Sequence, residues 1–229
     1  TALTAQNTMG VTAIEGTSTE MISAQLKAVL EDIGSDAVKI GMLHSIEVID
    51  TISKGLKQYQ PEHIVVDPVM VATSGDRLLE RDAVNALMTE IIPLAEVITP
   101  NVPELELLLG ENVNDVTEFS NYAKFLAEKF KVSVLLKAGH LKGNTSEDIL
   151  FNIKTNQITK LSAPRIDTQN THGTGCSLSS ALASYLARGY TLESAAQQAK
   201  TFIDEAILAG SKYKLGKGSG PIHHFYKQE

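Results

Sequence analysis

Short apolar runs alternate with longer amphipathic segments along most of the chain. Five runs have the length and composition of β-strands, at residues 1–5, 37–43, 63–71, 96–100 and 132–139. Between them, apolar residues recur three and four positions apart, which predicts helices at residues 19–33, 45–59, 81–92 and 117–130. Runs that are hydrophobic throughout and are separated by helices are typical of a parallel sheet with both faces covered. The pattern therefore predicts an α/β fold.

The last part of the chain departs from this alternation. Residues 147–162 alternate apolar and polar positions around Asn156, which predicts a hairpin at the edge of the sheet. Two helices are expected to follow, at residues 176–189 and 192–211. We find no internal repeat, low-complexity segment or linker, so residues 1–229 are expected to form one α/β domain.

Four polar residues are placed to cap helices. Thr19 and Ser45 stand at the starts of the first two predicted helices and are the expected N-caps. Asn101 and Glu104 have the spacing of an N-cap and the third helical residue before the apolar segment 102–109. A capping pair is one interpretation of these two residues, and a role in a site is the other.

Composition and charge narrow the class of protein. With 43% hydrophobic residues the chain is large enough to bury one sizeable core, and its net charge of -7 is spread without a basic block. Nucleic acid and anionic membranes are therefore not expected partners. A single cysteine forms no internal disulfide, and no run has the length of a membrane span or signal peptide, which indicates the cytoplasm. Because the first residue is Thr1, the sequence is expected to begin inside a larger protein.

Several chemically useful residues fall at or just beyond the predicted strand ends. In open parallel sheets, ligands bind at the carboxyl ends of the strands. The residues concerned are Gln6, Met42, Asp67, Asn101, Glu104 and Lys137. Asp67 ends an apolar strand, where a charge has no structural reason to lie unless it faces solvent or a ligand. Each of three candidates also has a structural interpretation: Lys137 as an ion-pair residue, and Met42 and Val69 as core residues.

The only cysteine lies in the stretch NTHGTGC, residues 170–176. Glycines allow a ligand to approach the backbone closely, and the free N–H groups at the start of a helix attract anions. The same helix start stabilises a thiolate, so Cys176 is a candidate base or nucleophile, although most lone cysteines are inert and buried. His172 suggests a thiol hydrolase, but residues so close in sequence seldom form a catalytic pair.

Seven motifs together resemble one family. They are TALTAQNT, KIGML, VVDPVMVATSGDRLL, ITPNVPE, LLKAGHL, NTHGTGC and GKGSGPIHHF, in the family's order and spacing. They resemble the hydroxymethylpyrimidine/phosphomethylpyrimidine kinases of thiamine biosynthesis, in the ribokinase-like superfamily. The resemblance implies a three-layer α/β/α sandwich with a mostly parallel sheet, and a homodimer. It also implies ATP-dependent phosphorylation of the pyrimidine's hydroxymethyl group and then of the resulting phosphate, with Mg²⁺.

The resemblance also implies a role for each candidate residue. Cys176 would be the base, and Gly173, Thr174 and Gly175 would form an anion hole with it. Contacts to ATP and its phosphates would come from Asn101, Lys137 and Thr174. Asp67 and Glu104 would bind Mg²⁺ directly or through water. The pyrimidine would bind to Gln6, Met42 and Val69.

Two alternative functions are also compatible with the sequence. Cysteine-containing pyridoxal kinases differ from this chain at QNT, residues 6–8, so pyridoxal kinase activity is the second candidate. A catalytically silent ligand-binding homologue is the third. The family's N-terminal strand and glycine-rich segment have no counterpart in these 229 residues. The glycines of residues 216–222 do not follow a strand or open a helix, so we expect a closing loop near the nucleotide rather than a dinucleotide fingerprint.

Overall fold

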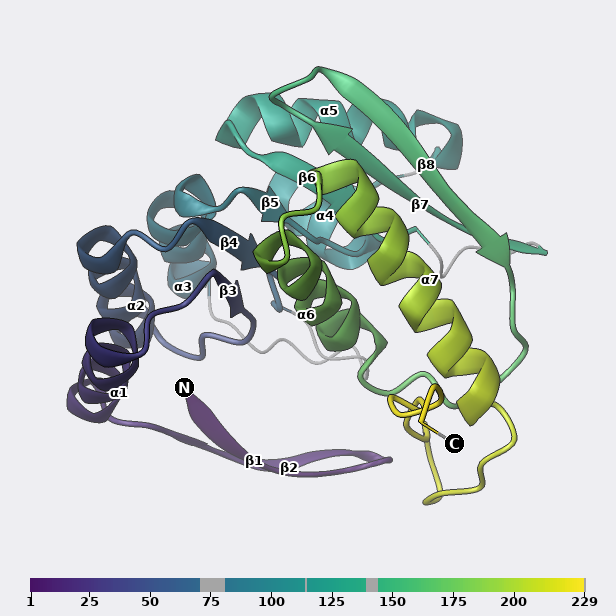
Figure 1. The fold of residues 1–229 in the computed structure, drawn as a ribbon, viewed down its shortest axis with the longest axis horizontal. Helices are drawn as coiled ribbons and strands as arrows, with labels where there is room; N and C mark the ends of the chain where they lie inside the picture. The colour runs from purple at the N-terminus through teal and green to yellow at the C-terminus, as the bar shows by residue number, and fades with distance from the viewer. Residues whose placement is uncertain (71–80, 114, 139–143, 229) are drawn as a thin grey trace.

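The computed structural model describes residues 1–70, 81–113, 115–138 and 144–228. Its centre is a six-stranded sheet in the order β3-β4-β5-β6-β7-β8 (Figure 1). The strands are β3 (Ala37–Ile40), β4 (His63–Val66), β5 (Val97–Ile98), β6 (Ser133–Leu136), β7 (Thr145–Asn152) and β8 (Gln157–Pro164). The pairs from β3 to β6 are parallel, and β7 and β8 are added antiparallel. The predicted α/β class and edge hairpin are confirmed.

Helices cover both faces of this sheet, which makes the three-layer sandwich (Figure 1). The helices are α1 (Thr19–Asp32), α2 (Ile46–Tyr59), α3 (Arg81–Ala86), α4 (Val102–Leu109), α5 (Phe119–Phe130), α6 (Thr174–Ala187) and α7 (Leu192–Gly210). One core lies between the sheet and α2, α4 and α5, and the other lies between the sheet and α6 and α7. Within β4, Ile64 and Val66 enter the first core and Val65 enters the second. Both faces are buried, which explains the continuous apolar runs.

The prediction that residues 1–5 join the parallel sheet is wrong. β1 (Ala2–Asn7) pairs antiparallel with β2 (Gly10–Gly16) in a separate two-stranded hairpin (Figure 1). The side chains of β1 are mostly exposed, and Leu3 is 73% exposed. The run contains alanine, threonine and glutamine instead of the valine and isoleucine that fill a two-sided core, and its partner strand is the next segment of the chain. Gln6 is therefore not at a strand end of the main sheet.

Several boundaries also differ from the predictions. Ser18, not Thr19, is the N-cap of α1, because its side chain accepts a hydrogen bond from the Met21 amide. Ser45 caps α2 as predicted. The helix predicted at residues 81–92 remains α-helical only to Ala86 and continues as a π-helical turn and a 3₁₀ turn. In the described ranges, no helix has the length and apolar character needed to cross a membrane.

Candidate active site

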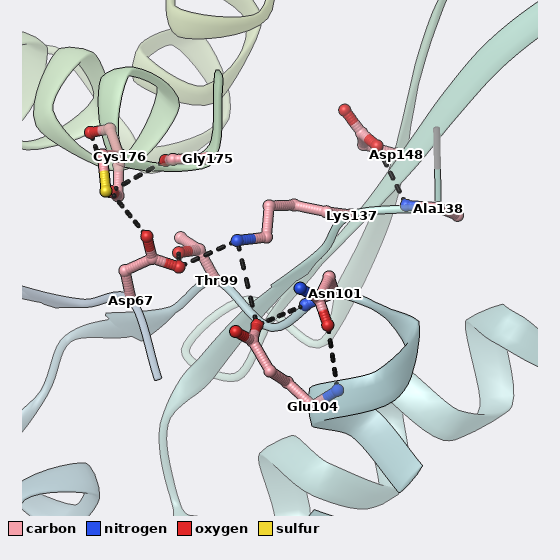
Figure 2. A network of polar contacts seen from close by, with 10 residues as sticks. Asp67, Thr99, Asn101, Glu104, Lys137, Ala138, Asp148, Gly175 and Cys176 are labelled. Carbon is pink, nitrogen blue, oxygen red and sulfur yellow. Dashed lines mark hydrogen bonds and ion pairs between the residues drawn. The ribbon is translucent and has the colours of Figure 1, made fainter. Parts of the chain in front are cut away.

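Asp67 and Lys137 meet at the carboxyl edge of the sheet (Figure 2). Asp67 directly follows β4, and Lys137 directly follows β6. Lys137 Nζ lies 2.8 Å from Asp67 Oδ1, and the Asp67 residue is only 2% exposed. Thr99, which follows β5, donates its hydroxyl to the same carboxylate oxygen at 3.1 Å. Three adjacent strands therefore place these groups together, as the strand-end rule predicts.

Glu104 joins this cluster through the start of α4. Asn101 Oδ1 accepts from the Glu104 amide at 2.9 Å, and Glu104 Oε2 accepts from the Asn101 amide at 2.8 Å. This reciprocal capping box confirms the structural reading of the pair. The same Oε2 atom lies 3.9 Å from Lys137 Nζ, so the capping carboxylate also faces the site (Figure 2).

The cluster carries two buried carboxylates and one ammonium. Burial raises the pKa of Glu104 to about 7, although the nearby Lys137 opposes this shift. Burial by itself would lower the pKa of Lys137, but the charges of Asp67 and Glu104 outweigh it and the pKa is raised. Above about pH 7, where Glu104 is ionised, the cluster carries one excess negative charge. Such a charge suits a hydrated divalent cation, which needs only one or two carboxylates. No group of three or more His, Cys, Asp or Glu side chains suitable for a metal occurs among the described residues.

The start of α6 faces Lys137 and Asp67. Gly173 is the N-cap with φ of 83°, a left-handed conformation that favours glycine, and no side chain caps this end. The Thr174 amide donates to Thr171 O at 3.3 Å, whereas the amides of Gly175 and Cys176 donate to no backbone carbonyl among the described residues. A Cβ at Gly175 would lie 3.3 Å from Lys137 Nζ and 3.9 Å from Asp67 Oδ2. The predicted anion-binding turn and the polar cluster are therefore neighbours.

Cys176 lies in the first turn of α6 and is exposed. It lines a groove of about 520 Å³ together with Ser177, Ser180, Tyr185, Arg188 and His224. The charge of a Cys176 thiolate also contributes to the raised pKa of Lys137, after the larger effects of burial, Asp67 and Glu104. The sulfur is thus reachable and close enough to Lys137 for their charges to interact.

The sequence argued against a catalytic pair of Cys176 and His172, and the geometry is consistent with this. His172 donates its backbone N–H to Gly220 O at 3.0 Å. Among the described contacts, the ring of His172 forms no hydrogen bond with Cys176. His224 Nε2 instead lies 2.7 Å from Ser177 Oγ, on the residue after the cysteine.

The three residues expected to bind the pyrimidine lie outside the polar cluster. Gln6 is exposed on β1, and Met42 and Val69 are half-buried after β3 and β4. Thr1 Oγ1 donates to Met42 O at 2.7 Å, which fixes the base of the hairpin beside the segment after β3. The roles of these three residues remain predictions, as do those of the cluster and of the Gly173–Cys176 turn.

Sequence reasoning missed three supporting residues. Thr99 and Ser179 are both fully buried, and each directs a hydroxyl at Asp67. Ser179 Oγ also lies 3.0 Å from Gly175 O and 3.1 Å from Cys176 O, so it joins Asp67 to the first turn of α6. Asp148 Oδ1 accepts from the Ala138 amide at 3.0 Å, directly after Lys137 (Figure 2). Only the position of Thr99 after a strand gave a signal.

Comparison with known proteins identifies the family. The phosphomethylpyrimidine kinase family model matches residues 1–223. The chain belongs to this family. It is 47% identical over 228 residues to hydroxymethylpyrimidine/phosphomethylpyrimidine kinase of Rhizobium meliloti, covering 99% of this chain and 85% of that protein. The chain is accordingly a kinase, that is, a phosphotransferase, and the resemblance seen in the sequence is confirmed.

Solved structures agree with this assignment. The crystal structure of phosphomethylpyrimidine kinase from Clostridium difficile has a TM-score of 0.77 and 41% identity, over 90% of this chain and 84% of that one. An ADP complex of Bacillus subtilis pyridoxal kinase has a TM-score of 0.87 and 32% identity, over 99% of this chain and 84% of that one. The family fold is therefore shared with kinases whose structures contain a bound nucleotide.

Proposed function

We propose that this kinase transfers the γ-phosphoryl group of ATP to 4-amino-5-hydroxymethyl-2-methylpyrimidine and then to the resulting monophosphate, in thiamine biosynthesis. Family membership supports the substrate. The observation that carries the chemistry is the uncapped glycine turn at the start of α6, which lies against Lys137 and next to an exposed Cys176. Anion-binding N–H groups, an ammonium and a candidate base at one place are the parts that phosphoryl transfer requires.

In the first transfer, the hydroxymethyl oxygen attacks the γ-phosphorus and the bond from this phosphorus to the β–γ bridging oxygen breaks. The hydroxyl proton goes to Cys176 Sγ, and ADP leaves with the bridging oxygen. The N–H groups of the Gly173–Cys176 turn hold the negative charge of the transferred group. In the second transfer, an oxygen of the monophosphate is the nucleophile, and this acceptor is already anionic.

Lys137 and Asn101 act on the nucleotide side. Lys137 contributes a positive charge to the phosphates, and the amide NH₂ of Asn101 donates to them while its Oδ1 stays on the capping box. Asp67 and Glu104 would hold Mg²⁺ directly or through water, since two carboxylates are enough for this strongly hydrated ion. When bound, the ion would neutralise charge on the phosphates.

A pyridoxal kinase is the second candidate, because the Bacillus subtilis pyridoxal kinase superimposes on 99% of this chain. A coupled ADP-release assay with hydroxymethylpyrimidine and with pyridoxal separates the two. The proposal requires faster turnover, in kcat/KM, with hydroxymethylpyrimidine and a second ADP for each pyrimidine consumed. Faster turnover with pyridoxal favours the alternative, and no turnover with either alcohol leaves a silent ligand-binding homologue.

A further inference from the structure

Thr8, at the turn of the β1–β2 hairpin, meets a loop that lies more than 200 positions later in the chain. Thr8 Oγ1 accepts hydrogen bonds from the amides of Lys217 and Gly218, both at 3.2 Å. Thr8 O accepts a third from the Ser219 amide at 2.9 Å. Figure 1 shows the hairpin extending from the α1 side of the molecule toward this C-terminal segment. These bonds fasten the tip of an otherwise exposed hairpin.

The glycines of the loop match this contact. A Cβ at Gly216 would overlap the side chain of Thr8, and a Cβ at Gly218 would overlap its carbonyl oxygen. Gly216 also has φ of +77°, which disfavours any side chain. The loop therefore approaches Thr8 as closely as it does only because these two positions are glycine. This requirement is a second observation, independent of the hydrogen bonds, that points to Thr8.

The same loop is fixed to the segment that leads into the anion-binding turn. Gly220 O accepts from the His172 amide at 3.0 Å, one residue before Gly173. Asn170 is 7% exposed, and its Nδ2 donates to Gly210 O and Tyr213 O, each at 2.8 Å. A Cβ at Gly220 would overlap Asn170 Oδ1. The contacts thus run without a break from the hairpin tip, through the loop, to the start of α6.

The geometry points to Thr8 as a positioning residue for substrate binding. Its hydroxyl fixes the hairpin to the loop that adjoins the Gly173–Cys176 turn, and so fixes the strand that carries Gln6 two residues away. The hairpin base is already held at Thr1 and Met42, so the contact at Thr8 restrains the opposite end. The inference rests on the proposed function in one respect, the role of Gln6 with the pyrimidine.

Three variants of the full chain test this inference. Thr8→Val keeps the shape and removes the acceptor, whereas Thr8→Ser keeps the acceptor and removes the methyl group. Thr12→Val, the control, removes a hydroxyl that donates within the hairpin, to Ala5 O. The KM for hydroxymethylpyrimidine should rise about tenfold in T8V, the effect of losing the acceptor of two N–H groups. The kcat and the KM for ATP should change less than about threefold, and T8S and T12V should resemble wild type.

Amide hydrogen exchange gives a readout that does not depend on activity. In T8V the Lys217 and Gly218 amides should exchange faster, while T8S retains their protection. Faster exchange with an unchanged KM would overturn the positioning role, and unchanged exchange in T8V would overturn the contact itself. An equal rise in KM in T8V and T8S would also overturn the role of the hydroxyl. If wild type does not turn over the pyrimidine, the proposed function fails, and the exchange comparison alone decides whether Thr8 holds the loop.

Discussion

The ammonium of Lys137 lies 2.8 Å from the carboxylate of Asp67, although the two residues are 70 positions apart in the chain. The Lys137 side chain is 13% exposed and that of Asp67 is 2% exposed, so the pair is largely removed from water. Glu104 Oε2 lies 3.9 Å from the same ammonium. The ammonium is therefore both a structural partner of two carboxylates and a proposed phosphate contact.

Lys137→Met should lower both the affinity for ATP and the stability of the folded protein. The KM for ATP should rise at least about tenfold because a charge-assisted phosphate contact is lost. The free energy of unfolding should fall by about 3 kcal/mol near pH 8, since two buried carboxylates lose their partner. The fall should be smaller near pH 6, where Glu104 takes up a proton. Urea denaturation at both pH values measures the free energy of unfolding. The control is Lys54→Met, because the Lys54 side chain is 75% exposed. An equal fall at both pH values would contradict it.

Glu104 should make stability fall as pH rises. Its folded pKa of about 7 lies above its usual value of 4.5, so between these values the folded state binds more protons than the unfolded state. The linkage relation then gives a loss of about 3 kcal/mol across this interval. The variant Glu104→Gln lacks this titration. Its free energy of unfolding should therefore rise relative to that of the wild type, by up to this amount, as the pH increases from about 5 to about 8. The exposed Glu111→Gln serves as control, and a difference independent of pH would refute the prediction.

Cys176→Ala should affect the two transfers unequally. Loss of a general base should slow phosphorylation of the alcohol by about 10²–10⁴-fold. Phosphorylation of the monophosphate should be slowed much less, because that acceptor is already ionised. Single-turnover assays with each substrate separate the steps. Ser180→Ala, in the same groove, is the matched control and should leave both rates within about twofold. Equal loss in both steps would count against the base role.

Gly175→Ala should separate activity from stability. Alanine is a better helix residue than glycine by up to about 1 kcal/mol, so the melting temperature should stay the same or rise. The added methyl group would lie 3.3 Å from Lys137 Nζ, at the edge where the phosphates are expected. We expect kcat/KM for ATP to fall about tenfold, because the methyl group would displace the Lys137 ammonium or the phosphates and so disturb the reacting geometry. Unchanged kinetics would show that Gly175 does not face the nucleotide, and exposed Ser184→Ala on the same helix is the control.

Periodicity and strand-end reasoning predicted most of the central sandwich and part of the site. Asp67 and Lys137 were recognisable because a charge directly after a buried strand is unusual, and Glu104 because its spacing from Asn101 is that of a capping box. The bonds of Ser179 were not predictable, since a helical serine more often bonds only to the preceding turn. The β1–β2 hairpin was misplaced because its first strand has the β-propensity of a sheet strand, although it lacks the valine and isoleucine that fill a two-sided core.

The bonds between residue 8 and residues 217–219 have a consequence for biosynthesis. The hairpin is translated more than 200 residues before the loop that binds its tip. Contacts of such long sequence separation form late, because a large loss of chain entropy precedes them. A nascent chain can therefore assemble the sheet and its covering helices while the hairpin tip is still unattached, and the attachment forms only after residues 217–219 have emerged.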